Sequence, residues 1–217
     1  MKLDLQKILE IEDQFSQNSY QGDVYSDQSL VVKQGIIPLI ISAPHTTKQI
    51  RNGHEKEADV YTGALALLLH EITGCHVILN TKLGEDPNYI LGGQYKEVLR
   101  EHCLNHEIDM VIDLHGAALS RTFDVDLGTS NGKTLSKQKL DSIIDRFKEA
   151  HIEATVDQRF TASHPGTITY HSYNTLKMEA VQIEINRKYR DPRRELDLFV
   201  GMVGCLSGII EMLTNIK

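Results

Sequence analysis

Apolar and polar positions along the chain fall into blocks that predict strands and helices in turn. Three apolar runs, rich in β-branched residues, are typical of buried strands. They cover residues 36–45 (IIPLIISAPH), 108–116 (IDMVIDLHG) and 178–187 (MEAVQIEINR). Between such runs, apolar residues recur with a helical period, most strongly from Glu57 to Ile72.

The alternation of strands and helices predicts the fold class. Further helices are expected over residues 3–15, 94–106, 136–153 and 196–214. Further strands are expected over residues 29–33, 75–81 and 156–160, with loops over residues 46–54, 83–89 and 161–174. This order indicates an α/β protein with three α/β/α layers around a central mixed, mostly parallel sheet. No repeat or linker interrupts the sequence, so we expect a single domain over residues 1–217.

Composition narrows the class of protein. The net charge of −7 argues against a nucleic-acid-binding surface, which needs basic patches. We find no apolar run suited to a membrane span and no apolar core of an export signal in MKLDLQKILEIEDQF, so a cytoplasmic protein is expected. The three cysteines lack metal-binding spacing and are expected to be free thiols. The sequence leaves the oligomeric state open.

Three of the predicted strands end in chemically active side chains. Their carboxyl ends carry His45, His115 and Glu184. Because ligands bind beyond the carboxyl ends of parallel strands, we expect these side chains to share one site. Two histidines and a carboxylate form a typical catalytic zinc site with one open position, and a further carboxylate such as Glu184 would act as general base.

The third metal ligand is expected from GHEKEAD, residues 53–59. If the helix begins at Glu57, that carboxylate lies nearest the helix start and has the longer reach, so we favour Glu57 over Asp59. Both residues could instead merely compensate the helix dipole, and the choice between them stays open.

Asp113 lies two residues before His115 and therefore on the same face of the strand. From there it could orient the histidine ring from behind, or bind a buried arginine. A direct role as metal ligand is less expected.

Several stretches resemble the N-formylglutamate amidohydrolase family, one of the zinc-dependent carboxypeptidase-like hydrolases. The resemblance runs from about Pro38 to Pro192 and rests on SAPHTT, EADVYTGALA, DLHGA with FDVDLGT, and QIEINRKYRDP. It implies an α/β/α fold, one catalytic zinc ion per chain, and hydrolysis of the amide of a small acidic N-acyl amino acid such as N-formylglutamate. It also implies that His45 and His115 are ligands, that the third ligand comes from EKEAD, and that Glu184 is the base.

The sequence departs from the family pattern in two places. PHTTK replaces the more common PHSG type, and Lys48 stands where related carboxypeptidases carry a carboxylate ligand. LGEDPNYILGG, residues 83–93, matches the Asp-x-Asn-Arg stretch of the family only loosely, because Tyr89 follows Asn88. The identity of the substrate is therefore open.

Four residues are expected to contact the substrate. Arg121 could clamp a carboxylate, and His164 lies in a glycine-bearing loop that could cover the site. Asn88 is a further expected contact. Arg187 could stabilise the developing negative charge, but it reaches the site only if the strand ends by Asn186. Either arginine could instead form a structural ion pair.

Two other functions remain possible at this level. A non-catalytic metal-binding or regulatory domain would keep the fold and lose the base. A metal-dependent phosphoesterase would need more clustered aspartates, which Asp124 and Asp126 in FDVDLG could supply. The alternative for this pair is a solvated strand edge.

Overall fold

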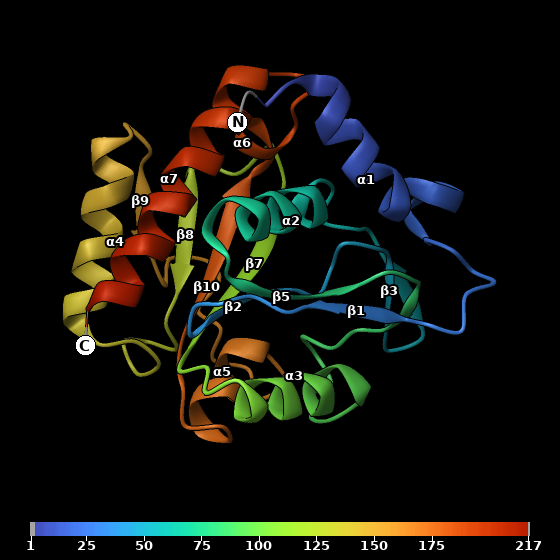
Figure 1. The fold of residues 1–217 in the computed structure, drawn as a ribbon, viewed down its shortest axis with the longest axis horizontal. Coiled ribbons are helices and arrows are strands. Elements are labelled where there is room, and N and C mark those ends of the chain that lie inside the picture. The colour runs from blue at the N-terminus through green and yellow to red at the C-terminus, as the bar shows by residue number, and fades with distance from the viewer. Residues whose placement is uncertain (1–2, 217) are drawn as a thin grey trace.

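The structure is a computed structural model that describes residues 3–216, and its centre is a seven-stranded sheet between two layers of helices (Figure 1). The strand order is β1-β5-β2-β7-β10-β8-β9. The neighbours β5, β2, β7 and β10 run parallel, whereas β1 and β8 pair antiparallel with β5 and β10. The bounds are β1 Leu30–Lys33, β2 Leu39–Ala43, β5 His76–Asn80, β7 Met110–Ala117, β8 Val125–Gly128, β9 Ala154–Val156 and β10 Glu179–Asn186. This confirms the predicted α/β/α fold with a mixed, mostly parallel sheet.

Helices cover both faces of the sheet (Figure 1). Their bounds are α1 Leu5–Tyr20, α2 Thr62–Thr73, α3 Gln94–Asn105, α4 Lys137–Glu149, α5 Ile168–Asn174, α6 Arg187–Arg190 and α7 Leu196–Asn215. Buried residues of α1, α2, α4 and α7 form one apolar core, and those of α3 and α5 form a second core on the opposite face.

The alternation of side chains along β10 divides its residues between these two layers. Val181, Ile183 and Ile185 pack into the larger core, as the sequence pattern predicts. Gln182 and Glu184 point to the opposite face, because successive side chains of a strand alternate. The chemically active face of the sheet is therefore the α3 and α5 side.

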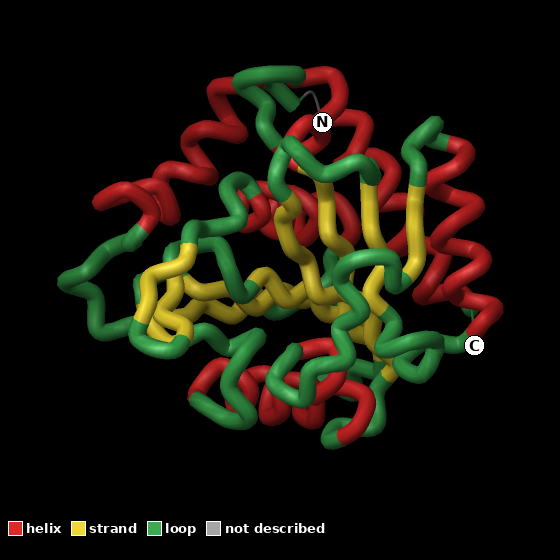
Figure 2. Tube along the Cα trace, turned by 180° about the vertical axis from the view of Figure 1, so that it is seen from behind, coloured by secondary structure: helices red, strands yellow, loops and turns green. Residues whose placement is uncertain are grey.

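A second, three-stranded sheet lies beside the main one, visible in Figure 2 as the short strands at one edge. Its order is β4-β3-β6, with bounds β3 Gln49–Arg51, β4 His54–Lys56 and β6 Gly84–Glu85. The sequence analysis predicted a loop over residues 46–54. Strands of two or three residues carry too little periodic signal to be recognised.

The helix expected from Glu57 begins instead at Thr62. Its first turn is capped from outside: the buried carboxylate of Glu12 in α1 accepts the backbone N–H of Tyr61 at 2.7 Å and that of Ala64 at 3.2 Å. Because the residue that caps α2 lies about 50 positions earlier in the chain, the sequence around Thr62 carries no signal for the helix start. The apolar period alone therefore placed the start of this helix too early.

Several further elements differ from expectation, including α1, which ends at Tyr20 rather than at residue 15. β9 covers residues 154–156 rather than 156–160, and the stretch 161–174 contains α5. Thr167 starts this helix, because its hydroxyl accepts the backbone N–H of Tyr170 at 3.2 Å. The predicted strand list also lacked β8.

Among the described residues, α7 is the one helix long and apolar enough, by length and composition, to cross a membrane. Half of its most apolar window is buried inside the protein, where α7 packs against α2 and α4. These contacts fit a core helix of a layered protein. The sequence of α7 is apolar enough to contradict the expectation that no run in the chain is suited to a membrane span. The expected absence of a membrane partner stays a prediction.

Candidate metal centre

Two predicted ligands and one residue from the adjacent loop meet beyond the carboxyl ends of β2 and β7. Nδ1 of His115 lies 3.1 Å from Nδ1 of His45 and 3.2 Å from Oδ2 of Asp59. The distance from His45 Nδ1 to Asp59 Oδ2 is 3.3 Å. Zinc bonds of about 2.0–2.1 Å to nitrogen and oxygen give a tetrahedron with edges of roughly 3.3 Å. The three donor atoms therefore fit three corners of a zinc site.

A carboxylate stands behind each histidine. Nε2 of His45 lies 2.9 Å from Oδ1 of Asp86, whose other oxygen accepts a hydrogen bond of 2.7 Å from Arg51. Nε2 of His115 lies 3.2 Å from Oδ2 of Asp113, close enough for an ion pair but without hydrogen-bond geometry, so the role of Asp113 in orienting this ring stays a prediction. Such backing carboxylates fix the ring orientation of metal-binding histidines, and here they leave both Nδ1 atoms facing the same point.

The loop that carries Asp59 is anchored to the strand ends. The N–H of Asp59 donates to the carbonyl of His45 at 2.8 Å. The buried guanidinium of Arg190 donates to the carbonyl of Val60 and, at 3.1 Å each, to those of Ala117 and Ile185. One buried cation thus joins the loop beside Asp59 to β7 and β10.

Gly116, which follows the metal-facing His115, has a packing reason. A Cβ atom at this position would lie 2.3 Å from the guanidinium carbon of Arg190, far inside contact distance. The glycine in DLHGA therefore makes room for the arginine that anchors the Asp59 loop.

The charges of the cluster favour a cation at its centre. Burial alone would lower the pKa of His45, but hydrogen bonding to Asp59 and Asp86 raises it to about 8. The same contacts hold the pKa values of Asp59 and Asp86 well below their usual range, against the effect of burial. The two carboxylates are thus anionic, and their negative charge favours protonation of the neighbouring imidazole. A bound divalent ion would balance this negative charge in place of the proton.

Glu184 lies beside the cluster on the neighbouring strand. In the parallel pair β7–β10 it is the register partner of His115. Its Oε1 accepts a hydrogen bond of 3.0 Å from Gln182, and burial raises its pKa to about 7. Glu184 and the three cluster residues line one cavity of about 530 Å³.

The outer wall of this cavity carries three of the four predicted substrate contacts. The guanidinium of Arg121 lies 5.5 Å from the ring centre of Phe160. His164 stacks on Tyr89 at 5.1 Å, and its Nδ1 accepts the N–H of Gly166 at 3.0 Å.

Asn88 also lines the cavity, but its side-chain oxygen accepts the N–H of Ile168 at 2.7 Å. That oxygen is therefore engaged in holding the start of α5, and only the amide nitrogen of Asn88 is left for a ligand.

The structure does not bring Glu57 into the cluster, so that expectation is corrected. Glu57 follows β4 in a loop, its side chain is 86% exposed, and its carboxylate lies 3.6 Å from Nζ of Lys48. Asp59 occupies the expected place instead. Glu57 was favoured because it was expected at the start of the helix. Since α2 does not start at Glu57, that reason does not hold.

Arg187 also departs from expectation. It begins α6 and pairs with Asp191 at 3.1 Å, and it is not among the residues that line the cavity. β10 does end at Asn186, yet the chain then turns so that Arg187 points away from the cavity. Arg187 therefore forms a structural ion pair, which was the alternative to a role in the active site.

The two aspartates considered for a two-metal site are engaged elsewhere. Asp126 accepts three backbone N–H groups, of Gln158, Arg159 and Phe160, at 2.8–3.2 Å. Asp124 pairs with Lys188 at 2.5 Å. Asp126 therefore shapes the loop that presents the Phe160 ring to Arg121, and neither aspartate joins the cluster.

Sequence reasoning missed Asp86, Arg51 and Arg190. Asp86 belongs to LGEDPNYILGG, the stretch that matches the family loosely, and this likeness was the one available signal. Arg51 binds the carboxylate of Asp86, and Arg190 binds backbone carbonyls of distant segments. Contacts between distant parts of the chain leave no local pattern in the sequence.

Comparison with known proteins supports the fold. No protein-family model and no curated protein sequence matches the chain. Among solved structures, an N-formylglutamate amidohydrolase from Ralstonia eutropha JMP134 aligns with a TM-score of 0.64 and 14% identity, over 86% of this chain and 97% of that one.

Two further structural neighbours are also hydrolases. A bacteriophage poly-gamma-glutamate hydrolase aligns with a TM-score of 0.58 and 16% identity, over 88% of this chain and 93% of that one. A metallo-carboxypeptidase from Pseudomonas aeruginosa aligns with a TM-score of 0.50 and 14% identity, over 88% of this chain and 62% of that one. At these identities the likeness concerns the fold. The neighbours are hydrolases, and they include the family that the sequence motifs resemble.

Proposed function

We propose that the protein is a zinc-dependent amidohydrolase that cleaves the amide of a small anionic N-acyl amino acid. The observation that carries this proposal is the meeting of three metal-ligand atoms, at tetrahedral spacing, beside a buried glutamate in one cavity. The structural neighbours named above are hydrolases of related bonds, which agrees with this class of reaction. N-formylglutamate is the first compound to test.

The cofactor that we propose is one zinc ion per chain, held by His45, Asp59 and His115. Two imidazoles and one carboxylate are a common ligand set for catalytic zinc and leave one position open. When bound, zinc polarises the scissile carbonyl and lowers the pKa of a bound water toward neutrality.

Glu184 would act as the proton carrier. It would accept a proton from the water that attacks the amide carbonyl, and then deliver that proton to the nitrogen as the C–N bond breaks. Gln182 donates to Oε1 of Glu184 and leaves Oε2 available for this transfer. The products would be the free amino acid and the carboxylic acid of the acyl group.

The cavity suits an anionic substrate. Arg121 and Lys56 line it, and neither has a carboxylate partner among the described residues. Arg51, by contrast, is neutralised by Asp86. We infer that Arg121 pairs with a substrate carboxylate in the bidentate manner that guanidinium groups favour.

Both alternative functions fit less well. A purely metal-binding domain gives no reason to bury Glu184 beside the ligands, since burying a carboxylate is costly and one hydrogen bond from Gln182 offsets only part of that cost. A two-metal phosphoesterase needs a second set of ligands, and Asp124 and Asp126 are engaged in the loop and ion-pair contacts described above.

The test is an activity screen of zinc-loaded protein against N-formyl, N-acetyl and N-succinyl amino acids with acidic and neutral side chains. We expect hydrolysis of an acidic member, and a loss of about 10²–10⁴-fold in Glu184→Gln with zinc content unchanged. Glu184→Gln that keeps full turnover would show that another group carries the proton. Hydrolysis of phosphate esters alone would refute the amidohydrolase assignment.

A further inference from the structure

A second group of histidines lies at the opposite end of the sheet. His76 is the first residue of β5, whereas the candidate metal centre lies beyond the other ends of the parallel strands. His76 is 3% exposed, and its Nδ1 lies 2.7 Å from Nε2 of His102 in α3. His106, the residue that ends α3, places its ring centre 4.4 Å from that of His102 and 5.2 Å from that of His76.

The pair His76–His102 repeats the geometry of the proposed zinc ligands. Its ring centres are 4.9 Å apart with an interplanar angle of 66°. The corresponding values for His45 and His115 are 4.7 Å and 69°. In both pairs one nitrogen of each ring faces a nitrogen of the other ring, at 2.7 Å in His76–His102 and at 3.1 Å in His45–His115. The shorter distance is that of a hydrogen bond between the rings, and a shared ion would move the two nitrogens to roughly 3.3 Å apart.

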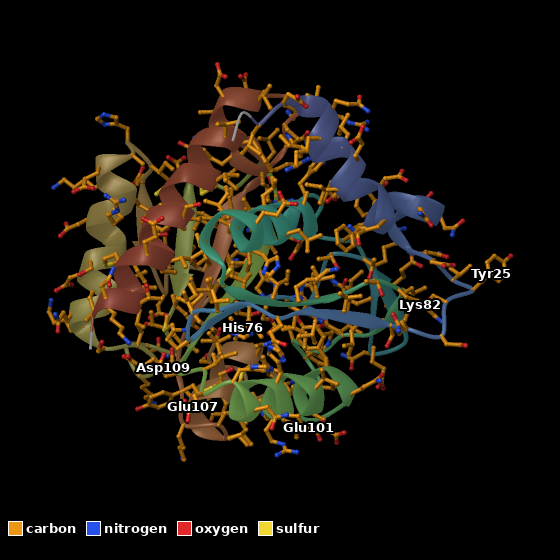
Figure 3. The ribbon with its side chains drawn as sticks, in the orientation of Figure 1. Tyr25, His76, Lys82, Glu101, Glu107 and Asp109 are labelled. Atoms are coloured by element: carbon orange, nitrogen blue, oxygen red, sulfur yellow. The ribbon has the colours of Figure 1, made fainter. Side chains whose placement is uncertain are left out.

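A third ring and an open approach complete this arrangement. His106 follows the last residue of α3, four positions after His102, and its ring lies beside that of His102. The ring of His106 lies nearer to that of His102 than to that of His76, and its side chain is half-buried. Joint coordination requires this ring to rotate, because its donor atoms do not meet those of the other two rings among the described residues. With His76 and Glu107 it lines a hollow of about 260 Å³, on the α3 side of the sheet where Figure 3 shows His76 and Glu107.

The protonation state suits metal binding. Burial, together with the neighbouring imidazoles, lowers the pKa of His76 to about 4 and lowers that of His102. Both rings are therefore neutral at physiological pH, and neutral imidazole is the form that coordinates metals.

We propose that His76, His102 and His106 form a second metal site, which takes one divalent transition metal ion of the zinc, copper or nickel class. Imidazole nitrogen suits these ions, whereas magnesium and calcium require oxygen ligands. The ion would join the end of α3 to the start of β5. The site is independent of the proposed hydrolase activity, because it shares no residue with the cavity.

The test uses Ni²⁺ as probe on protein already loaded with one equivalent of zinc, followed by titration calorimetry and by a dye that reports released zinc. We expect one Ni²⁺ per chain to bind without zinc release and to raise the melting temperature. His102→Ala and His106→Ala should each weaken Ni²⁺ binding by about tenfold or more, since even outer contacts of metal sites are worth about 10–100-fold. His54→Ala, an exposed histidine of β4, is the matched control and should bind Ni²⁺ as the unmodified chain does.

Three results would overturn the proposal. They are absence of Ni²⁺ binding, release of zinc in proportion to the Ni²⁺ bound, or unchanged Ni²⁺ affinity in both His102→Ala and His106→Ala. Because His106 is half-buried, its alanine variant keeps the test decisive even if the His102 variant folds poorly.

Discussion

At the scale of single residues, the candidate site depends on polar side chains placed on one face of buried strands. Asp113, Gln182 and Glu184 all lie within the sheet interior, where an unpaired polar group is costly. Each is engaged with a neighbour: Asp113 with His115 and Ser42, and Gln182 with Glu184. These contacts offset the cost of burying the polar groups. We expect them also to orient His115, the proposed ligand, and Glu184, the proposed base.

The role of Arg121 can be tested with a substitution. Arg121→Met should raise KM for an anionic substrate by about 10–100-fold with little change in kcat, because a lost charge-assisted hydrogen bond costs about 1.5–3 kcal/mol. Arg187→Met is the matched control, since Arg187 does not line the cavity. Steady-state kinetics on both variants would contradict the assignment if the KM effect appeared in Arg187→Met, or in neither.

The sequence predicted which residues lie together where a strand end marked the position, while the roles of those residues stay predictions. His45, His115 and Glu184 each follow or end an apolar run, and the parallel sheet brings such ends together. The prediction failed for the third cluster residue because the choice of Glu57 over Asp59 depended on where α2 begins. That boundary is set by Glu12, a contact between distant parts of the chain.

At the scale of elements, two loops that form the cavity wall are fastened to each other by a buried lysine. Nζ of Lys96 in α3 donates to the carbonyls of Pro87 and Gly166 at 2.6 Å each, and also to that of Ile90. Lys96 is 2% exposed, and burial lowers its pKa to about 8. It thereby joins the loop before α3 to the loop before α5.

Removing this lysine should weaken the whole wall. Lys96→Met leaves three buried carbonyls without their donor, so we expect the free energy of unfolding to fall by about 3 kcal/mol or more. Lys133→Met, at an exposed position, is the control and should change stability by less than about 0.5 kcal/mol. Urea denaturation of the three proteins measures this. Equal stability of Lys96→Met and the unmodified chain would show that the loops hold together without it.

The sequence predicted the long elements and missed the short ones for a common reason. β2, β7 and β10 are buried along nearly their whole length, and each carries enough apolar residues to be recognised as a strand, in a continuous run in β2 and at alternate positions in β10. β3, β4, β6 and α5 are short and partly exposed, and their positions depend on tertiary contacts such as the Asn88–Ile168 hydrogen bond. Periodicity cannot detect elements of this kind.

At the scale of the whole molecule, the buried carboxyl of Glu12 links α1 to α2 and makes stability depend on pH. Burial raises the pKa of Glu12 from its ordinary 4.5 to about 7, although the hydrogen bonds of Tyr61, Tyr20 and Ala64 act in the opposite direction. Between these two pH values the folded chain binds a proton at Glu12 that the unfolded chain has lost. Stability therefore falls as pH rises through this window.

We expect the unmodified chain to lose roughly 2–3 kcal/mol of stability between about pH 4.5 and pH 7, relative to Glu12→Gln. Glu10→Gln, at an exposed position of the same helix, controls for the removal of a negative charge. Urea unfolding of the three proteins at several pH values gives the comparison. A difference between the unmodified chain and Glu12→Gln that stayed constant with pH would contradict the assignment.

Several properties of the whole molecule stay predictions. They are the single domain over residues 1–217, the cytoplasmic location and the absence of nucleic-acid or membrane partners. The acyl group of the substrate also awaits the activity screen.

The central claim is that His45, Asp59 and His115 hold zinc. The most direct test is calorimetric titration of metal-free protein with zinc, compared between Asp59→Ala and Glu57→Ala. We predict that Asp59→Ala weakens the tightest zinc-binding event by about a hundredfold or more, whereas Glu57→Ala leaves it unchanged, because Glu57 points to solvent and Lys48. The opposite order, or tight zinc binding that survives both changes, would contradict the site described here.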